Sequence, residues 1–237
     1  RIAIDCVNST GGIVIPRLLK ALGVKNITEI YCEPTGIFPH NPEPLPDNIN
    51  YICNEINHGQ YDLGIVVDPD VDRLAFVTED GTPFGEEYTL VACADYVLSK
   101  IPGSTVSNLS SSRALRDVTE KHGGTYKASA VGEVNVVQLM KDSEAIIGGE
   151  GNGGIIYPEL HYGRDSLVGV ALFLTHLAEK KISVSDLRKE YPSYFMSKKK
   201  IELTPELEEK VRSIVREELE RRLAVTREDW SQQTMAA

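Results

Sequence analysis

The run Asp68–Arg73, with the sequence DPDVDR, carries the clearest chemistry in this sequence of 237 residues. Its three aspartates fall at alternate positions, so their like charges would repel one another and raise each other's pKa values. Such a group is stable when it is fully exposed or when a cation lies among the carboxylates. Magnesium prefers oxygen ligands and combines protein carboxylates with phosphate and water. The spacing therefore predicts a magnesium site at Asp68, Asp70 and Asp72.

Arg73 adds a planar fork of donors that suits a phosphate, so metal and arginine together indicate phosphoryl chemistry. A calcium-binding EF-hand loop also begins with alternating aspartates, but it needs glycine at its sixth position, where this run has Arg73. Its flanks, Leu63–Val67 and Leu74–Thr78, also read as strands rather than helices. Two alternatives remain open: a phosphotransferase with Asp68 as nucleophile, and an acidic solvated turn without a ligand.

A second candidate is the glycine-rich segment Gly148–Gly154, with the sequence GGEGNGG. Its glycine spacing matches a dinucleotide-binding fingerprint, but that motif must open a helix and this one opens a short apolar strand. Asn152-Gly153 is a preferred hairpin turn. Glu150 and Asn152 offer acceptors and a donor that suit a pair of sugar hydroxyls. A tight connection that binds nothing is the alternative.

Two further segments contain polar residues that could act at a site. His40 lies in the proline-rich loop 34–46, where it could bind phosphate or could belong to a stiff surface loop. The segment His161–Ser166 precedes a nearly all-apolar predicted helix. Its Arg164 and Asp165 are candidate substrate-binding residues, and residues at that position are also ordinary helix caps.

The elements that must position these residues form two similar series. Leu63–Val67 is apolar and β-branched, which is typical of a strand buried on both faces of a largely parallel sheet. The expected strands begin near residues 1, 27, 63, 74, 105, 125, 145 and 155. The expected helices span about 11–22, 47–58, 86–99, 113–122 (capped by Ser110–Ser112), 133–141, 167–177 and 182–190. Ligands gather at the carboxyl ends of the strands in such folds.

We therefore predict an α/β fold with two similar three-layer domains, each with a mixed, mostly parallel sheet, plus a C-terminal helix. The predicted division is 1–87, 88–197 and 198–237. The last part contains a helix that starts at Thr204-Pro205. Its apolar stripe consists of Leu207, Val211, Ile214, Val215, Leu219 and Leu223. Residues 226–237 carry no motif and are expected to be weakly ordered.

Composition narrows the possible partners and location. The net charge is −10, and no basic run is longer than Lys198–Lys200, which argues against nucleic acid as a partner. The four cysteines lack CxxC spacing, which predicts reduced thiols in a cytoplasmic protein. No apolar segment approaches the length of a membrane span, and no signal peptide is visible. Arg1 already lies within a strand pattern, so we expect that the chain is cut from a longer one.

Four segments in this order resemble the α-D-phosphohexomutases: phosphomannomutase, phosphoglucomutase and phosphoglucosamine mutase. They are Asp5–Gly12 (DCVNSTGG), Phe38–Pro44 (FPHNPEP), Asp68–Arg73 and Gly149–Gly154. The resemblance covers about residues 1–200. It corresponds to the second and third of the four domains of those enzymes, so the first and fourth domains would be missing from this chain.

The resemblance implies a magnesium-dependent isomerase that interconverts 1-phospho and 6-phospho hexoses (mannose, glucose or glucosamine) through a phosphoserine. It assigns the three aspartates of the acidic run to Mg²⁺, Arg73 to the phosphate, and Glu150 and Asn152 to sugar hydroxyls. The phosphoserine belongs to the first domain, so the chain alone should be inactive. A sugar-phosphate binding module without catalysis is the alternative.

Three positions depart from the family pattern. Pro39 precedes His40-Asn41-Pro42 where the nucleophile loop of the family has serine. Pro69 stands where glycine is usual. Gly154 stands where many members have a histidine proposed as general base, and His161 is the substitute that we consider.

Overall fold

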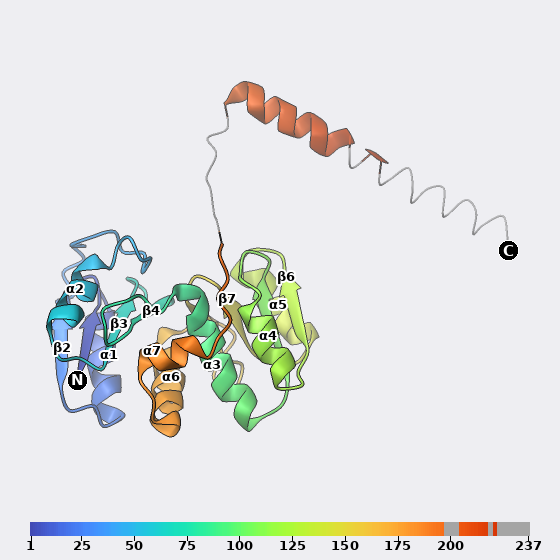
Figure 1. Cartoon of the computed structure of the whole chain (residues 1–237). Helices are drawn as coiled ribbons and strands as arrows, with labels where there is room; N and C mark the ends of the chain where they lie inside the picture. The colour runs from blue at the N-terminus through green and yellow to red at the C-terminus, as the bar shows by residue number, and fades with distance from the viewer. Residues whose placement is uncertain (197–203, 218–219, 222–237) are drawn as a thin grey trace. The chain divides into compact units, whose positions relative to one another are not determined.

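The computed structural model describes residues 1–196, 204–217 and 220–221. The chain divides into two compact units, Arg1–Phe195 and Met196–Ala237. The first unit contains two four-stranded sheets (Figure 1). The second contains a helix over residues 205–217.

The first sheet has the strand order β2-β1-β3-β4. Its strands are β1 (Ile2–Asp5), β2 (Ile27–Ile30), β3 (Leu63–Val67) and β4 (Leu74–Val77), and its helices are α1 (Gly11–Ala21) and α2 (Asn50–His58). β1 pairs in parallel with β2 and β3, whereas β4 runs antiparallel to β3. Every residue of β3 is buried, as its continuous apolar sequence predicts.

The second sheet repeats this order as β6-β5-β7-β8. Its strands are β5 (Ser104–Asn108), β6 (Tyr126–Ser129), β7 (Ala145–Glu150) and β8 (Gly154–Ile156), and its helices are α4 (Ala114–Lys121) and α5 (Glu133–Asp142). Again the first three strands pair in parallel and the last, β8, is antiparallel. The prediction of two similar α/β domains with mixed, mostly parallel sheets is confirmed.

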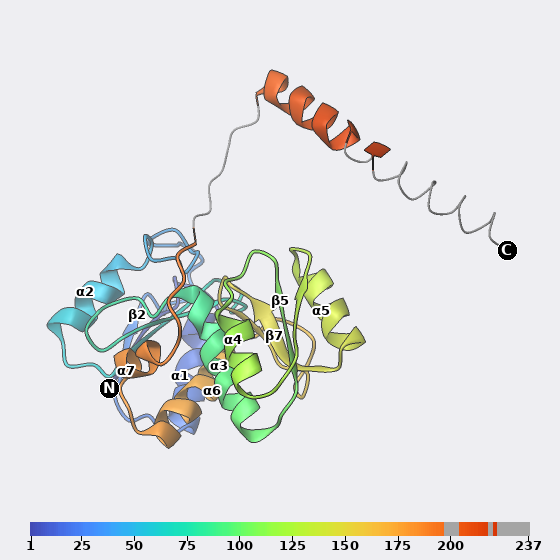
Figure 2. The same cartoon turned by 45° about the vertical axis from the view of Figure 1, so that its right-hand side comes forward.

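A central helical layer joins the two sheets. α3 (Glu86–Lys100) and α6 (Ser166–Lys180) pack against each other and contact strands of both sheets. Both helices lie between the sheets in Figures 1 and 2, with α7 (Val184–Lys189) beside α6 in Figure 1. Phe173 of α6 stacks on Phe76 of β4 with a centroid separation of 3.7 Å. On the outer faces, α2 packs on the first sheet and α5 packs on the second, which completes the three layers.

Several predicted helix boundaries differ from the structure by up to three residues, as at the end of α6, which reaches Lys180 rather than Leu177. α2 begins at Asn50 rather than near Asp47. α4 begins at Ala114 with Arg113 at its N-cap position, and the Arg113 side chain makes no cap hydrogen bond. Of the predicted serine cap, Ser112 accepts the N–H of Ala114 at 3.4 Å, whereas the Ser111 hydroxyl accepts the backbone N–H of Gly151 at 3.0 Å. A glycine-rich turn has few side chains to satisfy its amides, so a hydroxyl from the neighbouring loop is used there.

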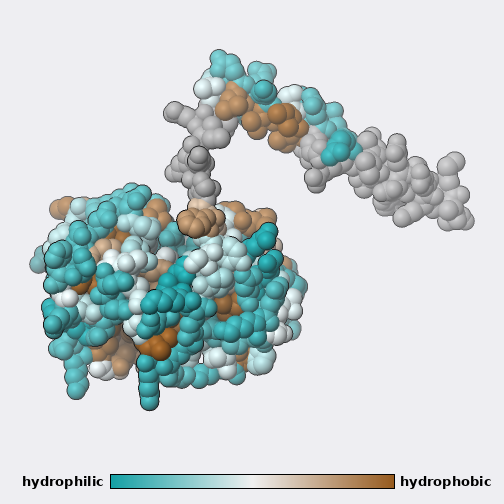
Figure 3. Space-filling model, in the orientation of Figure 1, coloured by the Kyte–Doolittle hydropathy of each residue, from teal (hydrophilic) through white to brown (hydrophobic). Residues whose placement is uncertain are grey.

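The predicted C-terminal helix is present over residues 205–217. Leu207, Val211, Ile214 and Val215 are exposed along it and give this helix its brown stripe in Figure 3. The remaining stripe residues Leu219 and Leu223, the predicted boundary at 197/198 and the segment 226–237 lie outside the described residues. Within the described ranges, none of the helices has both the length and the apolar character that a membrane crossing requires.

Candidate functional site

The acidic loop, residues 68–73, connects β3 to β4 and is organised by the buried carboxylate of Asp68. Its Oδ1 accepts the backbone N–H groups of Asp72 and Arg73, both at 3.0 Å. Its Oδ2 accepts Nε of Arg73 at 2.8 Å. Burial alone would raise the pKa of Asp68, but these hydrogen bonds outweigh it and hold the pKa below its ordinary value. These bonds fix the Asp68 carboxylate at the start of the loop and hold it in its ionised form.

The three aspartates come together as the sequence predicts. One carboxylate oxygen from each of Asp68, Asp70 and Asp72 lies within 4.8 Å of the others. Burial, followed by the adjacent Asp68 carboxylate, raises the pKa of Asp72 to about 7. This mutual repulsion is the reason why a cation would stabilise the group, and the all-oxygen donor set fits magnesium.

Arg73 is held on both sides by carboxylates. Its Nε bonds to Asp68, and its Nη1 donates to Oε1 of Glu43 at 3.1 Å. These two protein carboxylates therefore orient the guanidinium at the edge of the acidic loop, and no ligand is needed to do so.

The glycine loop, residues 148–154, ends β7 and turns into β8. Its Asn152-Gly153 pair forms the predicted hairpin, because Glu150 pairs with Gly154 across two antiparallel strands. Glu150 is only 6% exposed. Its Oε1 accepts Nδ2 of Asn108 at 2.7 Å, and its Oε2 accepts Nη1 of Arg164 at 3.0 Å. The Asn152 side chain accepts the N–H of Gly154 at 3.3 Å.

The acidic loop and the glycine loop are linked through the residues beside them. The backbone N–H of Leu74 donates to the carbonyl of Gly153 at 3.1 Å. Gly153 has φ +89°, and a Cβ there would lie 2.2 Å from the carbonyl oxygen of Leu74, so only glycine permits this approach. Arg164 also pairs with Asp72, and the N–H of Ser166 donates to the carbonyl of Val71 at 3.0 Å.

The other two candidate residues of the 161–166 segment are engaged with each other. Oδ1 of Asp165 caps α6 by accepting the N–H groups of Leu167 and Val168. Its Oδ2 lies 2.9 Å from Nε2 of His161. Nδ1 of His161 accepts the N–H of Gly163 at 3.0 Å, so this geometry leaves neither ring nitrogen of His161 free to act as a general base.

His40 lies at the carboxyl end of β1. Its Nε2 is 3.0 Å from Oδ2 of Asp5, and its Nδ1 is 2.8 Å from the carbonyl of Asn41. Burial raises the pKa of Asp5 despite this contact. Both ring nitrogens have protein partners, which agrees with a role in fixing the proline-rich loop.

Residues that the sequence analysis did not assign complete the site. Asn108 contacts Glu150, Glu133 contacts Arg164, and Glu43 contacts Arg73. Asn108 could have been found, because it is a polar residue at the carboxyl end of β5, the same edge that carries Glu150. Glu133 and Glu43 carry no comparable signal, since surface glutamates at a helix start and in a loop are common.

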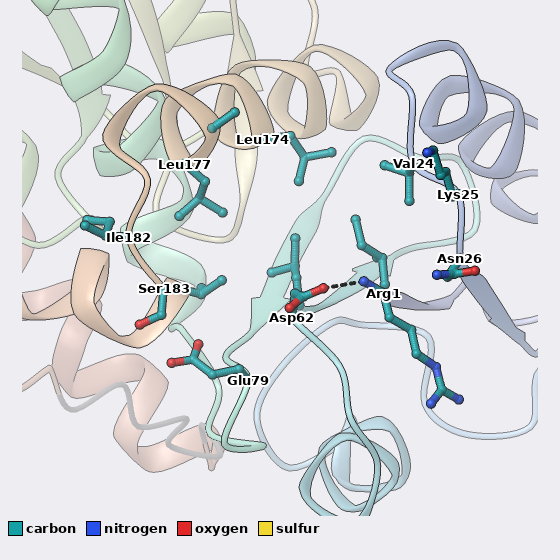
Figure 4. A pocket seen from close by; sticks show the side chains of 14 residues that line it. Arg1, Val24, Lys25, Asn26, Asp62, Glu79, Leu174, Leu177, Ile182 and Ser183 are labelled. Carbon is teal, nitrogen blue, oxygen red and sulfur yellow. Dashed lines mark hydrogen bonds and ion pairs between the residues drawn. The ribbon is translucent and has the colours of Figure 1, made fainter.

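A pocket of about 480 Å³ lies at the opposite edge of the first sheet (Figure 4). Ile2 and Leu63 line it at the amino ends of β1 and β3, together with Leu174 and Leu177 of α6. The chemistry-bearing residues lie at the other ends of these elements, so we assign the candidate site to the two loops and not to this pocket.

The two α/β/α domains and their two loops can be compared with known proteins. Residues 1–81 match the family description "Phosphoglucomutase/phosphomannomutase, alpha/beta/alpha domain II", and residues 85–194 match domain III. The chain belongs to this α-D-phosphohexomutase family and covers its domains II and III.

Individual relatives give the same result. The chain is 32% identical over 217 residues to a probable phosphoglucosamine mutase of Methanopyrus kandleri, covering 91% of this chain and 48% of that protein. It is 31% identical to a phosphoglucomutase/phosphomannomutase of Thermococcus kodakarensis, covering 84% of this chain and 44% of that protein. A crystal structure of a phosphoglucomutase/phosphomannomutase family protein from Burkholderia thailandensis superposes with a TM-score of 0.73 and 27% identity, covering 81% of this chain and 42% of that one. The chain thus spans about half the length of these relatives.

Proposed function

We propose that this chain forms the metal-binding and sugar-binding half of a magnesium-dependent phosphohexomutase, an isomerase that interconverts 1-phospho and 6-phospho hexoses. The observation that carries the proposal is that the acidic loop and the glycine loop lie side by side. Leu74, directly after the acidic loop, donates to Gly153, and Arg164 pairs with both Asp72 and Glu150. Two loops with complementary chemistry in one unit can hold the phosphate and the sugar ring of one ligand.

Different residues would bind the phosphate and the sugar of the ligand. Asp68, Asp70 and Asp72 would hold Mg²⁺, which, when bound, neutralises charge on the phosphoryl group. Arg73, already oriented by Asp68 and Glu43, would contact that phosphate.

On the sugar side, Glu150 and Asn152 would hold two hydroxyls. Each oxygen of Glu150 has one protein donor and can accept a further hydrogen bond. Arg164 and Asp165, on the adjoining segment, are proposed as further substrate-binding residues.

The remaining parts of the reaction belong to other domains. We propose the division 1–87, 88–197 and 198–237, which the family matches at 1–81 and 85–194 support. The phosphoserine and the terminal phosphate-binding loop would come from the first and fourth domains, which are therefore partners of this chain. A cytoplasmic location is proposed from the free thiols of Cys6, Cys32, Cys53 and Cys93.

Calorimetric titration of the chain with glucose, mannose and glucosamine 6-phosphates in the presence of Mg²⁺ tests the proposal. At least one of them should bind, and Glu150→Gln should weaken that binding about tenfold, or 1.4 kcal/mol. Glu159→Gln makes the same charge change at an exposed position and should have no effect. Equal binding by both variants, or no binding by the unmodified chain, would contradict the proposal.

The same preparation tests the missing phosphoserine. The chain alone should show no mutase turnover with any of these sugars, because the group that donates the phosphoryl lies in the first domain. Turnover by the chain alone would show that the assignment of the phosphoserine to another domain is wrong.

A further inference from the structure

Arg164 is the residue through which the acidic loop and the glycine loop share charge. Its Nη2 pairs with Oδ2 of Asp72, and its Nη1 donates to Oε2 of Glu150 at 3.0 Å. Its Nε lies 3.2 Å from Oε2 of Glu133. Three carboxylates from three different segments therefore converge on one guanidinium, whose side chain is 19% exposed.

This arrangement makes Arg164 a competitor for a metal at the acidic loop. Asp72 is one of the three clustered aspartates, and the oxygen that Arg164 contacts is a potential metal ligand. A guanidinium and a divalent cation repel each other when they approach the same carboxylate. A cation bound to Asp72 would therefore compete with Arg164 for that carboxylate.

The other end of the same guanidinium contacts the glycine loop. Glu150 accepts Nη1 of Arg164 on one oxygen and Nδ2 of Asn108 on the other. Asp72, Arg164, Glu150 and Asn108 thus form one continuous chain of polar contacts across the two sheets. A change in the partners of Arg164 alters the charge that Glu150 faces.

We propose that Arg164 is a positioning residue that occupies Asp72 in the metal-free protein, moves off it when the cation binds, and so couples metal binding to the sugar-binding carboxylate Glu150. The proposal rests on the metal role assigned above. Release from Asp72 leaves Nη2 as a donor beside Glu150, so metal binding prepares the glycine loop for an oxygen-rich ligand. Because coupling is reciprocal, such a ligand would also tighten metal binding.

Calorimetric titration with Mg²⁺ tests this competition in the full 237-residue chain. Arg164→Gln should bind Mg²⁺ about tenfold more tightly than the unmodified chain, because a competing cation is removed. Arg116→Gln removes an arginine that pairs with Asp117 and Glu120 on α4 and should leave the affinity unchanged. Unchanged or weaker binding by a folded Arg164→Gln would overturn the proposal, and general damage to the loop could not produce tighter binding.

The single variant leaves the buried Glu150 without its cation and could unfold for that reason. The double variant Arg164→Gln/Glu150→Gln removes that carboxylate's charge, and it should show the same tightening relative to Glu150→Gln alone. Equal affinities in this pair would overturn the proposal. If neither the unmodified chain nor any variant bound Mg²⁺, the assignment of the three aspartates to a metal would be wrong. That outcome is distinct from unchanged affinity in the Arg164 variants.

Nuclear magnetic resonance of the Asn108 side-chain amide reads the coupling directly, since this amide donates to Glu150. Saturating Mg²⁺ should shift this signal in the unmodified chain and leave it unshifted in Arg164→Gln. A shift of equal size in both proteins would show that the metal reaches Glu150 by a route that does not involve Arg164, which would contradict the proposal.

Discussion

The two halves of the first unit use one strand arrangement to present different chemistry. Both sheets place their third strand between a parallel and an antiparallel neighbour, and in both the candidate residues follow that strand. After β3 the chain has a loop of charged residues held by the buried Asp68. After β7 it has a turn of small residues in which Gly153 contacts the backbone of Leu74. The comparison shows that the scaffold determines where the site lies, and that loop length and side-chain size determine what each half contributes.

The largest expected effect concerns the difference in side-chain size. Gly153→Ala should lower the free energy of unfolding by about 3 kcal/mol or more, because its Cβ would lie 2.2 Å from a backbone oxygen of Leu74 and its φ is +89°. Urea denaturation measures this loss.

Gly123→Ala is the matched control for Gly153. Gly123 has φ +74° and open space where a Cβ would lie, so replacing it with alanine should cost only about 1 kcal/mol from backbone strain. Equal losses for the two variants would show that the contact with Leu74 is not what requires glycine in the turn.

The helical layer that both halves share should affect stability and not metal binding, unlike the loops in which the halves differ. Asp95 of α3 is buried and contacts His122 at 2.7 Å and His176 at 3.1 Å. Burial acts to raise the pKa of Asp95, but the hydrogen bonds from His176 and His122 outweigh it and depress that pKa. Asp95→Asn should therefore lose about 2 kcal/mol of stability near pH 7 and leave Mg²⁺ affinity unchanged.

The pH dependence of this loss follows from the sign of the pKa shift. A depressed folded-state pKa stabilises the protein above the unfolded value of about 3.9, and that stability disappears as the pH falls through the folded value. The difference between the unmodified chain and Asp95→Asn should therefore shrink when urea denaturation is repeated at pH 3 instead of pH 5. A constant or growing difference would be inconsistent with a depressed pKa.

The smallest expected effect in free energy tests the charge of the acidic loop. Asp70 is exposed, so Asp70→Asn should change the unfolding free energy by less than about 0.5 kcal/mol. It removes one metal ligand and should weaken Mg²⁺ binding at least about tenfold, or 1.4 kcal/mol, in calorimetry. Asp47→Asn at another exposed position should bind Mg²⁺ normally. Loss of binding in both variants would indicate that net charge, rather than ligation, attracts the ion.

The sequence predicted the fold and the two loops because their signals are local. An unbroken apolar strand before the acidic run identifies both a buried strand and the sheet edge where its carboxylates lie. The partners of Arg164 were not predictable in this way. Asp72 lies 92 positions from Arg164 in the chain. The pairing of these two residues depends on how α3 and α6 pack the two sheets together. The separate roles of the three serines were not predictable either, because a hydroxyl can cap a helix locally, as Ser112 does, or reach across to a distant amide, as Ser111 does to Gly151.

A cation bound at the acidic loop should lie against the glycine loop. Paramagnetic broadening by Mn²⁺ tests this arrangement most directly. Mn²⁺ accepts the same carboxylate and water ligands as Mg²⁺. At stoichiometric Mn²⁺ the amide signal of Gly153 should broaden, that of Gly23 before β2 should persist, and Asp70→Asn should restore the Gly153 signal. A Gly153 signal that persists in the unmodified chain, or that is lost equally in Asp70→Asn, would contradict the account.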